Sequence, residues 1–132
     1  MVKADVSLDL ERRIGRVLVV EDDPGERARL ISFLRKFGLY EISQAQNGRE
    51  GLNYLGQGKY RVVFSDCSMP EIDGLQMLES MRERGDYTPV VYVTSTNPDD
   101  VVPFADMFGP YDLVSKIHME QDLPKVIGKY LH

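Results

Sequence analysis

Short runs of β-branched and other apolar residues recur along the chain, and segments of helical periodicity lie between them. The clearest runs are RVLVV (16–20), RVVFS (61–65) and VVYV (90–93); DLVS (112–115) is weaker, and YEISQAQ (40–46) alternates weakly, like an edge strand. Unbroken runs of this length are typical of strands that are buried on both faces. They predict a sheet that is covered by helices on both sides.

The intervals between these runs have the apolar spacing of amphipathic helices. Three predicted helices end just before a glycine, which is the usual helix stop, at Gly38, Gly85 and Gly109. A short helix is predicted over 48–55 and a closing helix over 121–131. Strands that are joined through helices must be parallel, with right-handed crossovers. The pattern of five βα units therefore predicts a three-layer α/β sandwich.

Composition narrows the class of protein. A chain of 132 residues fits one domain. Its 16 basic and 21 acidic residues give a net charge of −5, which argues against a sequence-independent grip on nucleic acid or on an anionic membrane. The single cysteine, Cys67, excludes an internal disulfide and favours a reducing, cytoplasmic location. No apolar run has the length of a signal peptide or a membrane span, so we expect a cytoplasmic protein.

Polar residues stand at four of the predicted strand ends. Glu21 and Asp22 follow the first strand, Asp66 the third, Thr94 closes the fourth and Lys116 follows the fifth. Parallel strands bring their carboxyl ends to one edge of the sheet, where ligands of such folds bind. Carboxylates, a hydroxyl and an ammonium at one edge indicate a Mg²⁺ and phosphoryl site, in which one carboxylate can act as nucleophile. A divalent cation would also explain why so many acids are gathered there.

The motifs VLVVEDDP, AQNGREGL, VVFSDCSMPEIDGLQML, PVVYVTS and VSK follow one another over residues 15–131. In order and spacing they resemble the signatures of the receiver domain of two-component response regulators. The resemblance implies a CheY-like, flavodoxin-like doubly wound fold, with a five-stranded parallel sheet in the order 2-1-3-4-5. We therefore expect a receiver domain over 14–132, and the polar residues over 1–13 predict an N-terminal extension before it.

The resemblance implies roles for the residues at the sheet edge. Asp66 falls on the family's phosphoacceptor, Thr94 on its hydroxyl switch and Lys116 on its phosphate-binding lysine. The Mg²⁺ ligands would be Glu21, acting mainly through water, Asp22, Asp66 and the backbone carbonyl of Ser68, whereas Asp23 would lie outside the site. The expected reaction is transfer of a phosphoryl group from a phosphohistidine to Asp66, in a signalling domain rather than a conventional enzyme.

The same resemblance implies the partners. They are a sensor histidine kinase or a histidine phosphotransfer protein upstream and an output protein or domain downstream, without direct contact to nucleic acid or membrane. A phosphorylation-dependent homodimer is a further expectation.

The sequence departs from the family pattern at two positions. Ile117 follows the lysine where a proline is usual, and Leu113 occupies the position of the family's switch aromatic. A cis peptide bond without proline costs about 2.5–4 kcal/mol, so we expect a trans bond between Lys116 and Ile117. We also expect the signal to leave through residues 95–108 rather than through the side chain at 113.

Other interpretations remain open at this point. Asp66 could cap a helix, Thr94 could be an ordinary strand residue, Lys116 could be solvated, and Cys67 and His118 are expected to be a small core residue and a surface residue. A receiver fold kept only for docking, without phosphorylation, is the main functional alternative. A phosphatase of the dehalogenase type would need a second acid where Ser68 stands. A flavin domain would need a phosphate-binding loop in place of EDDPGER.

Overall fold

The computed structural model describes residues 15–39, 41–69 and 72–130. It contains one sheet of five parallel strands in the order β2-β1-β3-β4-β5, which confirms the predicted topology. The strands are β1 (Val17–Val20), β2 (Ile42–Ala45), β3 (Val62–Ser65), β4 (Val90–Thr94) and β5 (Tyr111–Ser115). The predicted N-terminal extension at 1–13 lies outside the described residues.

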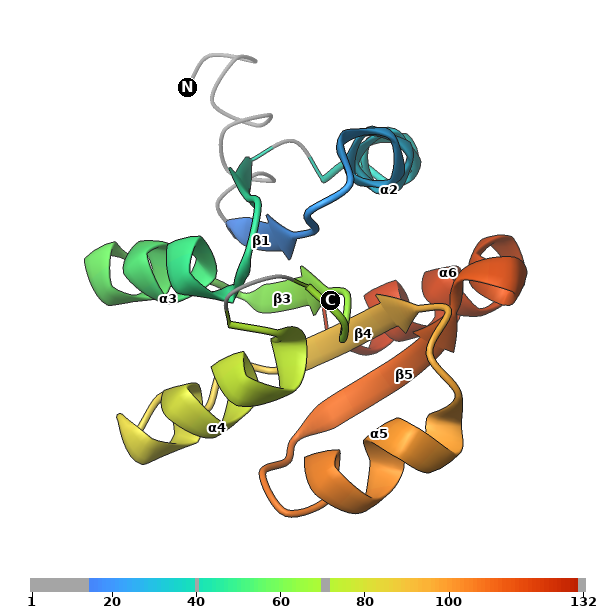
Figure 1. The fold of residues 1–132 in the computed structure, drawn as a ribbon. Helices are drawn as coiled ribbons and strands as arrows, with labels where there is room; N and C mark the ends of the chain where they lie inside the picture. The colour runs from blue at the N-terminus through green and yellow to red at the C-terminus, as the bar shows by residue number, and fades with distance from the viewer. Residues whose placement is uncertain (1–14, 40, 70–71, 131–132) are drawn as a thin grey trace, which may run out of the picture.

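Helices connect the strands and cover both faces of the sheet (Figure 1). They are α2 (Pro24–Lys36), α3 (Gly48–Gln57), α4 (Gly74–Glu83), α5 (Pro98–Ala105) and α6 (Met119–Tyr130), and the 3₁₀ turn η1 (Lys116–His118) precedes α6. Asp23, Asn47, Asp73 and Asn97 accept backbone N–H groups as N-caps of the first four of these helices, which fixes where each begins.

Several helix boundaries differ from the sequence-based expectation, and helix α3, for example, runs to Gln57 rather than to 55. Helix α5 ends at Ala105, although its apolar pattern continues to Phe108, because the N–H groups of Met107 and Phe108 bond to carbonyls three residues back and form a tighter turn. Helix α6 begins at Met119 rather than at 121. The Ser115 hydroxyl accepts the N–H of Ile117 and starts η1, which leads directly into that helix.

The sheet separates two hydrophobic cores, because successive strand residues point to opposite faces. One core lies under α2 and α6, and its largest buried side chains include Leu34, Phe64 and Leu123. The other lies under α3, α4 and α5, and includes Leu18, Met77 and Tyr92. This is the predicted three-layer arrangement, and Figure 1 shows α2 and α6 together on one side of the sheet.

The strand register aligns the carboxyl ends of the strands at one edge. Val20 pairs with Ser65 between β1 and β3, and Thr94 pairs with Ser115 between β4 and β5. The residues that follow these positions must therefore emerge beside one another. The Lys116–Ile117 bond is trans, as predicted, and His118 is exposed. None of the described helices combines the length and hydropathy that a membrane crossing requires.

Candidate functional site

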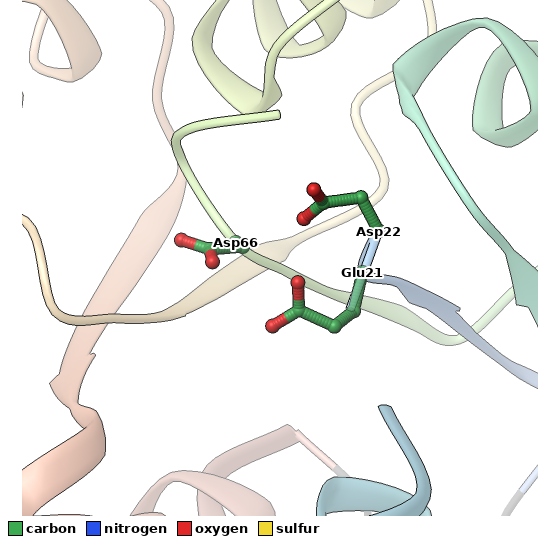
Figure 2. A group of neighbouring side chains, drawn as sticks. All are labelled: Glu21, Asp22 and Asp66. Atoms are coloured by element: carbon green, nitrogen blue, oxygen red, sulfur yellow. The ribbon is translucent and has the colours of Figure 1, made fainter. Parts of the chain in front are cut away.

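Three carboxylates meet at the carboxyl edge of the central strands. Glu21 and Asp22 follow β1, and Asp66 follows β3, with its N–H donating to the carbonyl of Val20 at 3.1 Å. An oxygen atom from each carboxylate lies within 4.8 Å of the others. Figure 2 shows the three side chains reaching into one space. The structure thus brings together the three side chains that the sequence predicts as metal ligands.

Asp23, the third acid of the run, is the N-cap of helix α2. One carboxylate oxygen of Asp23 accepts the N–H of Gly25 at 2.9 Å and that of Glu26 at 3.5 Å, at the start of helix α2. A negative charge there also complements the positive end of the helix dipole. Asp23 therefore lies outside the carboxylate cluster, as predicted.

Lys116 supplies the positive charge of the site. Its Nζ donates to Glu21 Oε1 at 2.8 Å and to Asp66 Oδ2 at 3.0 Å. Although burial acts to lower the pKa of Lys116, these hydrogen bonds to Glu21 and Asp66 raise it overall. The ammonium therefore stays charged and is aimed at Asp66.

Thr94 contacts the other oxygen of Asp66. Its hydroxyl donates to Asp66 Oδ1 at 2.6 Å and accepts the N–H of Thr96 at 3.1 Å. The N–H of Cys67 donates to the same Asp66 oxygen at 2.7 Å. Both oxygens of Asp66 are thus held by donors, Oδ1 by a hydroxyl and an amide and Oδ2 by an ammonium, so the carboxylate is fixed in one orientation.

Glu21 is the most enclosed acid of the cluster, with 3% of its surface exposed. Burial is the main cause of its raised pKa, and the nearby Asp66 charge adds to it, while the hydrogen bond from Lys116 acts in the opposite direction. Asp22, by contrast, is exposed to solvent. The cluster thus has one sheltered carboxylate next to the lysine and one open carboxylate at the rim.

Two further charged residues border the site and were not predicted from the sequence. Arg27 Nη1 donates to the carbonyl of Glu21 at 2.8 Å, and Glu26 Oε2 lies 3.8 Å from Lys116 Nζ. Both lie in the first turn of α2. The Asp23-Pro24 helix start, which places that turn over the end of β1, is the signal that could have identified them.

The loop between β3 and α4 is closed by tight backbone contacts. The N–H of Gly74 donates to the carbonyl of Cys67 at 2.9 Å, and a Cβ at Gly74 would lie 2.1 Å from the carbonyl oxygen of Asp66. On the neighbouring side, the N–H of Gly48 donates to the carbonyl of Ile72 at 2.9 Å. Glycine is needed at 74 because any side chain would push the loop away from Asp66.

Two residues of this loop had specific predictions. Ser68 is exposed, and the role of its carbonyl as a metal ligand stays a prediction. Cys67 is buried in the core under α3, α4 and α5, which confirms that it is a small core residue.

The donor set of the cluster fits a hard divalent cation. It consists of carboxylate oxygens, one of them at the solvent-exposed rim where water can complete the coordination, and Mg²⁺ prefers oxygen ligands while keeping several waters. Glu21, Asp22 and Asp66 are the side chains that would hold it.

Leu113 lies on β5, directly beside Tyr92 of β4. It is half-buried and packs against the core under α3, α4 and α5. Tyr111, two residues earlier, donates its hydroxyl to Asp106 at 2.5 Å. Strand β5 thus carries leucine at the position where the family's switch aromatic is expected, and the hydroxyl of Tyr111 on the same strand is hydrogen-bonded to Asp106.

The doubly wound sheet and the acidic cluster at its carboxyl edge define an α/β domain of the CheY-like, flavodoxin-like type. The family model of the response regulator receiver domain matches residues 17–128. The chain therefore belongs to the family of response regulator receiver domains, and receiver domains bind Mg²⁺ at an acidic cluster of this kind.

Individual relatives agree with this assignment. The chain is 29% identical over 120 residues to protein PilH of Pseudomonas aeruginosa, which covers 89% of this chain and 98% of PilH. It is 37% identical over 81 residues to the response regulator Rre1 of Synechocystis, covering 60% of this chain and 35% of Rre1. It is 33% identical over 101 residues to the transcriptional regulatory protein CiaR of Streptococcus pneumoniae, covering 76% of this chain and 44% of CiaR. The chain thus spans less than half of Rre1 and CiaR.

Solved structures show the same fold. The response regulator protein TrrA of Thermotoga maritima, in complex with Mg²⁺-BeF, has a TM-score of 0.77 at 28% identity, covering 88% of this chain and 98% of that chain. The chemotaxis protein CheY4 of Vibrio cholerae has a TM-score of 0.78 at 25% identity, with the same coverage of both chains.

Proposed function

We propose that this receiver domain accepts a phosphoryl group on Asp66 in the presence of Mg²⁺ and signals through the phosphorylated state. The observation that carries the proposal is the environment of Asp66, whose two carboxylate oxygens contact the Thr94 hydroxyl at 2.6 Å and the Lys116 ammonium at 3.0 Å. A hydroxyl and an ammonium are the groups that can bind the oxygens of an incoming phosphoryl group.

In the proposed reaction an oxygen of Asp66 attacks the phosphorus of a phosphohistidine. The bond between phosphorus and the imidazole nitrogen breaks as the bond between phosphorus and the Asp66 oxygen forms, and the imidazole leaves with the electron pair. Lys116 then pairs with a phosphoryl oxygen instead of with the free carboxylate, and Thr94 can donate to a second one. Mg²⁺, which Glu21, Asp22 and Asp66 would hold, would supply positive charge that offsets the negative charge of the phosphoryl group.

The test is the intact mass of the protein after incubation with acetyl phosphate and Mg²⁺. We expect an added mass of one phosphoryl group, which is absent in Asp66→Asn and absent when EDTA replaces Mg²⁺. Asp73→Asn is a matched control, because Asp73 is another acid of the same segment but serves as the N-cap of α4. A wild-type protein that gains no phosphoryl group under these conditions would contradict the proposal.

The alternative is a receiver fold that only docks partners. The completeness of the cluster argues against it, since Glu21 and Asp66 share Lys116 at 2.8 and 3.0 Å and all three carboxylates come together. Placing like charges close together costs free energy, and a fold that only docks partners through another surface would have no reason to keep such a cluster. This alternative would be supported if the protein were not phosphorylated and if Asp66→Asn left its affinity for the partner unchanged.

We further propose the partners and the location that this chemistry requires. The phosphoryl donor is a histidine kinase or a histidine phosphotransfer protein, and the downstream partner is an output protein or domain. The net charge of −5 argues against direct binding to nucleic acid or an anionic membrane surface. The single cysteine favours the cytoplasm. Light scattering with and without beryllofluoride would test the predicted phosphorylation-dependent homodimer.

A further inference from the structure

Strand β4 carries a fully buried tyrosine close to the site, at Tyr92. Tyr92 stands two residues before Thr94, so the two side chains lie on the same face of the sheet. The Tyr92 hydroxyl donates to the carbonyl of Gly74 at 2.8 Å, and this hydrogen bond is itself buried. The side chain thus joins β4 to the first residue of helix α4.

Gly74 is the residue that closes the β3–α4 loop against Asp66. Its N–H bonds to the carbonyl of Cys67 at 2.9 Å, and the N–H of Cys67 bonds to Asp66 Oδ1 at 2.7 Å. A chain of hydrogen bonds therefore runs from the Tyr92 hydroxyl through the backbone of Gly74 and Cys67 to the carboxylate of Asp66.

The tyrosine ring is held firmly enough to fix its hydroxyl. On β5 the ring of Tyr111 lies 6.3 Å from that of Tyr92, between ring centroids, at an interplanar angle of 55°. Such tilted contacts are favourable for aromatic pairs. Burial raises the pKa of Tyr92, so its hydroxyl stays neutral and remains a donor. A buried hydroxyl without a partner would be costly, and here the partner is Gly74.

We propose that Tyr92 is a positioning residue for phosphoryl transfer, whose hydroxyl holds the backbone of Gly74 and Cys67 in the arrangement that Mg²⁺ binding and attack by Asp66 require. The inference rests on the proposed function of Asp66. Its physical basis is that the fraction of molecules in which Gly74 and Cys67 are correctly placed limits the apparent affinity for any ligand that needs this arrangement.

The test compares Tyr92→Phe with Tyr60→Phe. Both changes remove one phenolic hydroxyl that donates a hydrogen bond of 2.8 Å, from Tyr92 to Gly74 and from Tyr60 to Ser43 on β2. Tyr60 precedes β3, at the opposite end of the sheet from the carboxylates, so it controls for the loss of a hydroxyl as such.

We expect Tyr92→Phe to raise the calorimetric Kd for Mg²⁺ about two- to tenfold, the range that the loss of one hydrogen bond allows. Phosphorylation by acetyl phosphate should slow by a similar factor, and amide exchange at Gly74 and Cys67 should accelerate. Tyr60→Phe should leave the affinity and both exchange rates unchanged. Equal Mg²⁺ affinity and equal exchange in Tyr92→Phe and the wild type would overturn the proposal.

The two hypotheses fail in different ways. A wild type that is never phosphorylated contradicts the proposed function, whereas a phosphorylated wild type with an unaffected Tyr92→Phe contradicts only the role of Tyr92. If Tyr92→Phe does not fold, hydrogen exchange in the wild type provides the test. Mg²⁺ should then slow amide exchange at Gly74 and Cys67. No change on adding Mg²⁺ would overturn the proposal.

Discussion

At the scale of single residues, Cys67 is an instructive neighbour of Asp66. The thiol is 3% exposed, and burial raises its pKa to about 12. Because the thiolate is the reactive form, we expect iodoacetamide to label the native protein at pH 8 at least about tenfold more slowly than the urea-unfolded chain. The measurement is the mass of the adduct over time, and equal rates in the two states would show that the thiol is accessible.

The sign of the accompanying pH dependence follows from the same shift. The pKa of Cys67 is higher in the folded protein than its ordinary value of 9.0, so the folded state retains a proton that the unfolded chain loses. The contribution of this thiol to stability is therefore complete below pH 9 and is lost as the pH rises toward 12. Cys67→Ala should lack this component of the pH dependence in urea unfolding measured between pH 8 and 10.

Three consecutive acids illustrate what single residues in a sequence can and cannot reveal. Strand-end position alone predicts that Glu21 and Asp22 join Asp66, and a proline after Asp23 indicates a helix start. Their different exposure was not predictable, because it depends on Lys116 and on α2, which pack over Glu21 and leave Asp22 at the rim. Non-local contacts thus give neighbouring residues of like chemistry different environments.

At the scale of elements, Arg82 joins three segments at the amino end of the sheet. Its guanidinium donates to the carbonyls of Asp86 and Thr88 before β4, and to those of Phe108, Gly109 and Pro110 before β5. The side chain is 9% exposed and is also stacked on Tyr87, with 5.6 Å between the guanidinium carbon and the ring centroid. Arg82 therefore fixes the carboxyl ends of α4 and α5 to each other.

We predict that Arg82→Met destabilises the fold by about 2–4 kcal/mol, because several carbonyls lose a charged donor at once. Arg84→Met is the matched control, since Arg84 lies two residues further along and is exposed. Urea unfolding of both variants measures the difference. A loss for Arg82→Met no larger than that for Arg84→Met would show that solvent replaces the guanidinium without cost.

Helix α5 is the element that we expect to respond to phosphorylation. It has only eight residues, and Pro103 inside it cannot donate a backbone hydrogen bond. Its amino end follows Thr94, which contacts Asp66, while the turn after its carboxyl end is held by Arg82. With Leu113 in place of the switch aromatic, movement of Thr94 should therefore be transmitted to the amino end of α5.

Hydrogen exchange with and without beryllofluoride tests this expectation. Changes should concentrate in residues 95–108, and they should be absent in Asp66→Asn. Within this segment, the change in exchange should be smallest at the carboxyl end, which lies next to Arg82. A response that is confined to the immediate neighbours of Asp66 would show that Leu113 only packs in the core and that α5 does not switch.

At the scale of the whole molecule, repulsion within the carboxylate cluster lowers the stability of the folded state. Glu21, Asp22 and Asp66 come together at one site, where the Lys116 ammonium pairs with Glu21 and Asp66, in a protein whose net charge is already −5. A cation that binds only the folded state stabilises it by mass action. We predict that Mg²⁺ at ten times its Kd raises the free energy of unfolding by about 1.4 kcal/mol.

The controls separate specific binding from screening. Sodium chloride of equal ionic strength should give little of this effect, and Asp22→Asn should reduce the response to Mg²⁺. Thermal unfolding with and without Mg²⁺ provides the measurement. The same increase in Asp22→Asn and in the wild type would show that the cation binds somewhere other than this cluster.

The global arrangement was predictable because its signals are local. Buried β-branched runs mark the strands, and the residue after each run reaches the ligand-binding edge whichever neighbours it has. The interactions that close the site were not predictable in this way. Arg82 appears in the sequence as a surface arginine and Tyr92 as a strand aromatic. Their long-range partners, Phe108 for Arg82 and Gly74 for Tyr92, lie more than 15 residues away in the sequence and become visible only when the layers are packed.

The most direct test of phosphoryl transfer to Asp66 locates the phosphoryl group on the chain. Borohydride reduces an acyl phosphate on aspartate to homoserine, which peptide mass spectrometry can assign to a residue. After incubation with acetyl phosphate and Mg²⁺, we predict homoserine at position 66 and at no other aspartate, with none in Asp66→Asn. Homoserine at Asp22 instead, 2-amino-5-hydroxypentanoic acid (the reduction product of a glutamyl phosphate) at Glu21 instead, or no reduced residue in a folded protein that binds Mg²⁺, would contradict it.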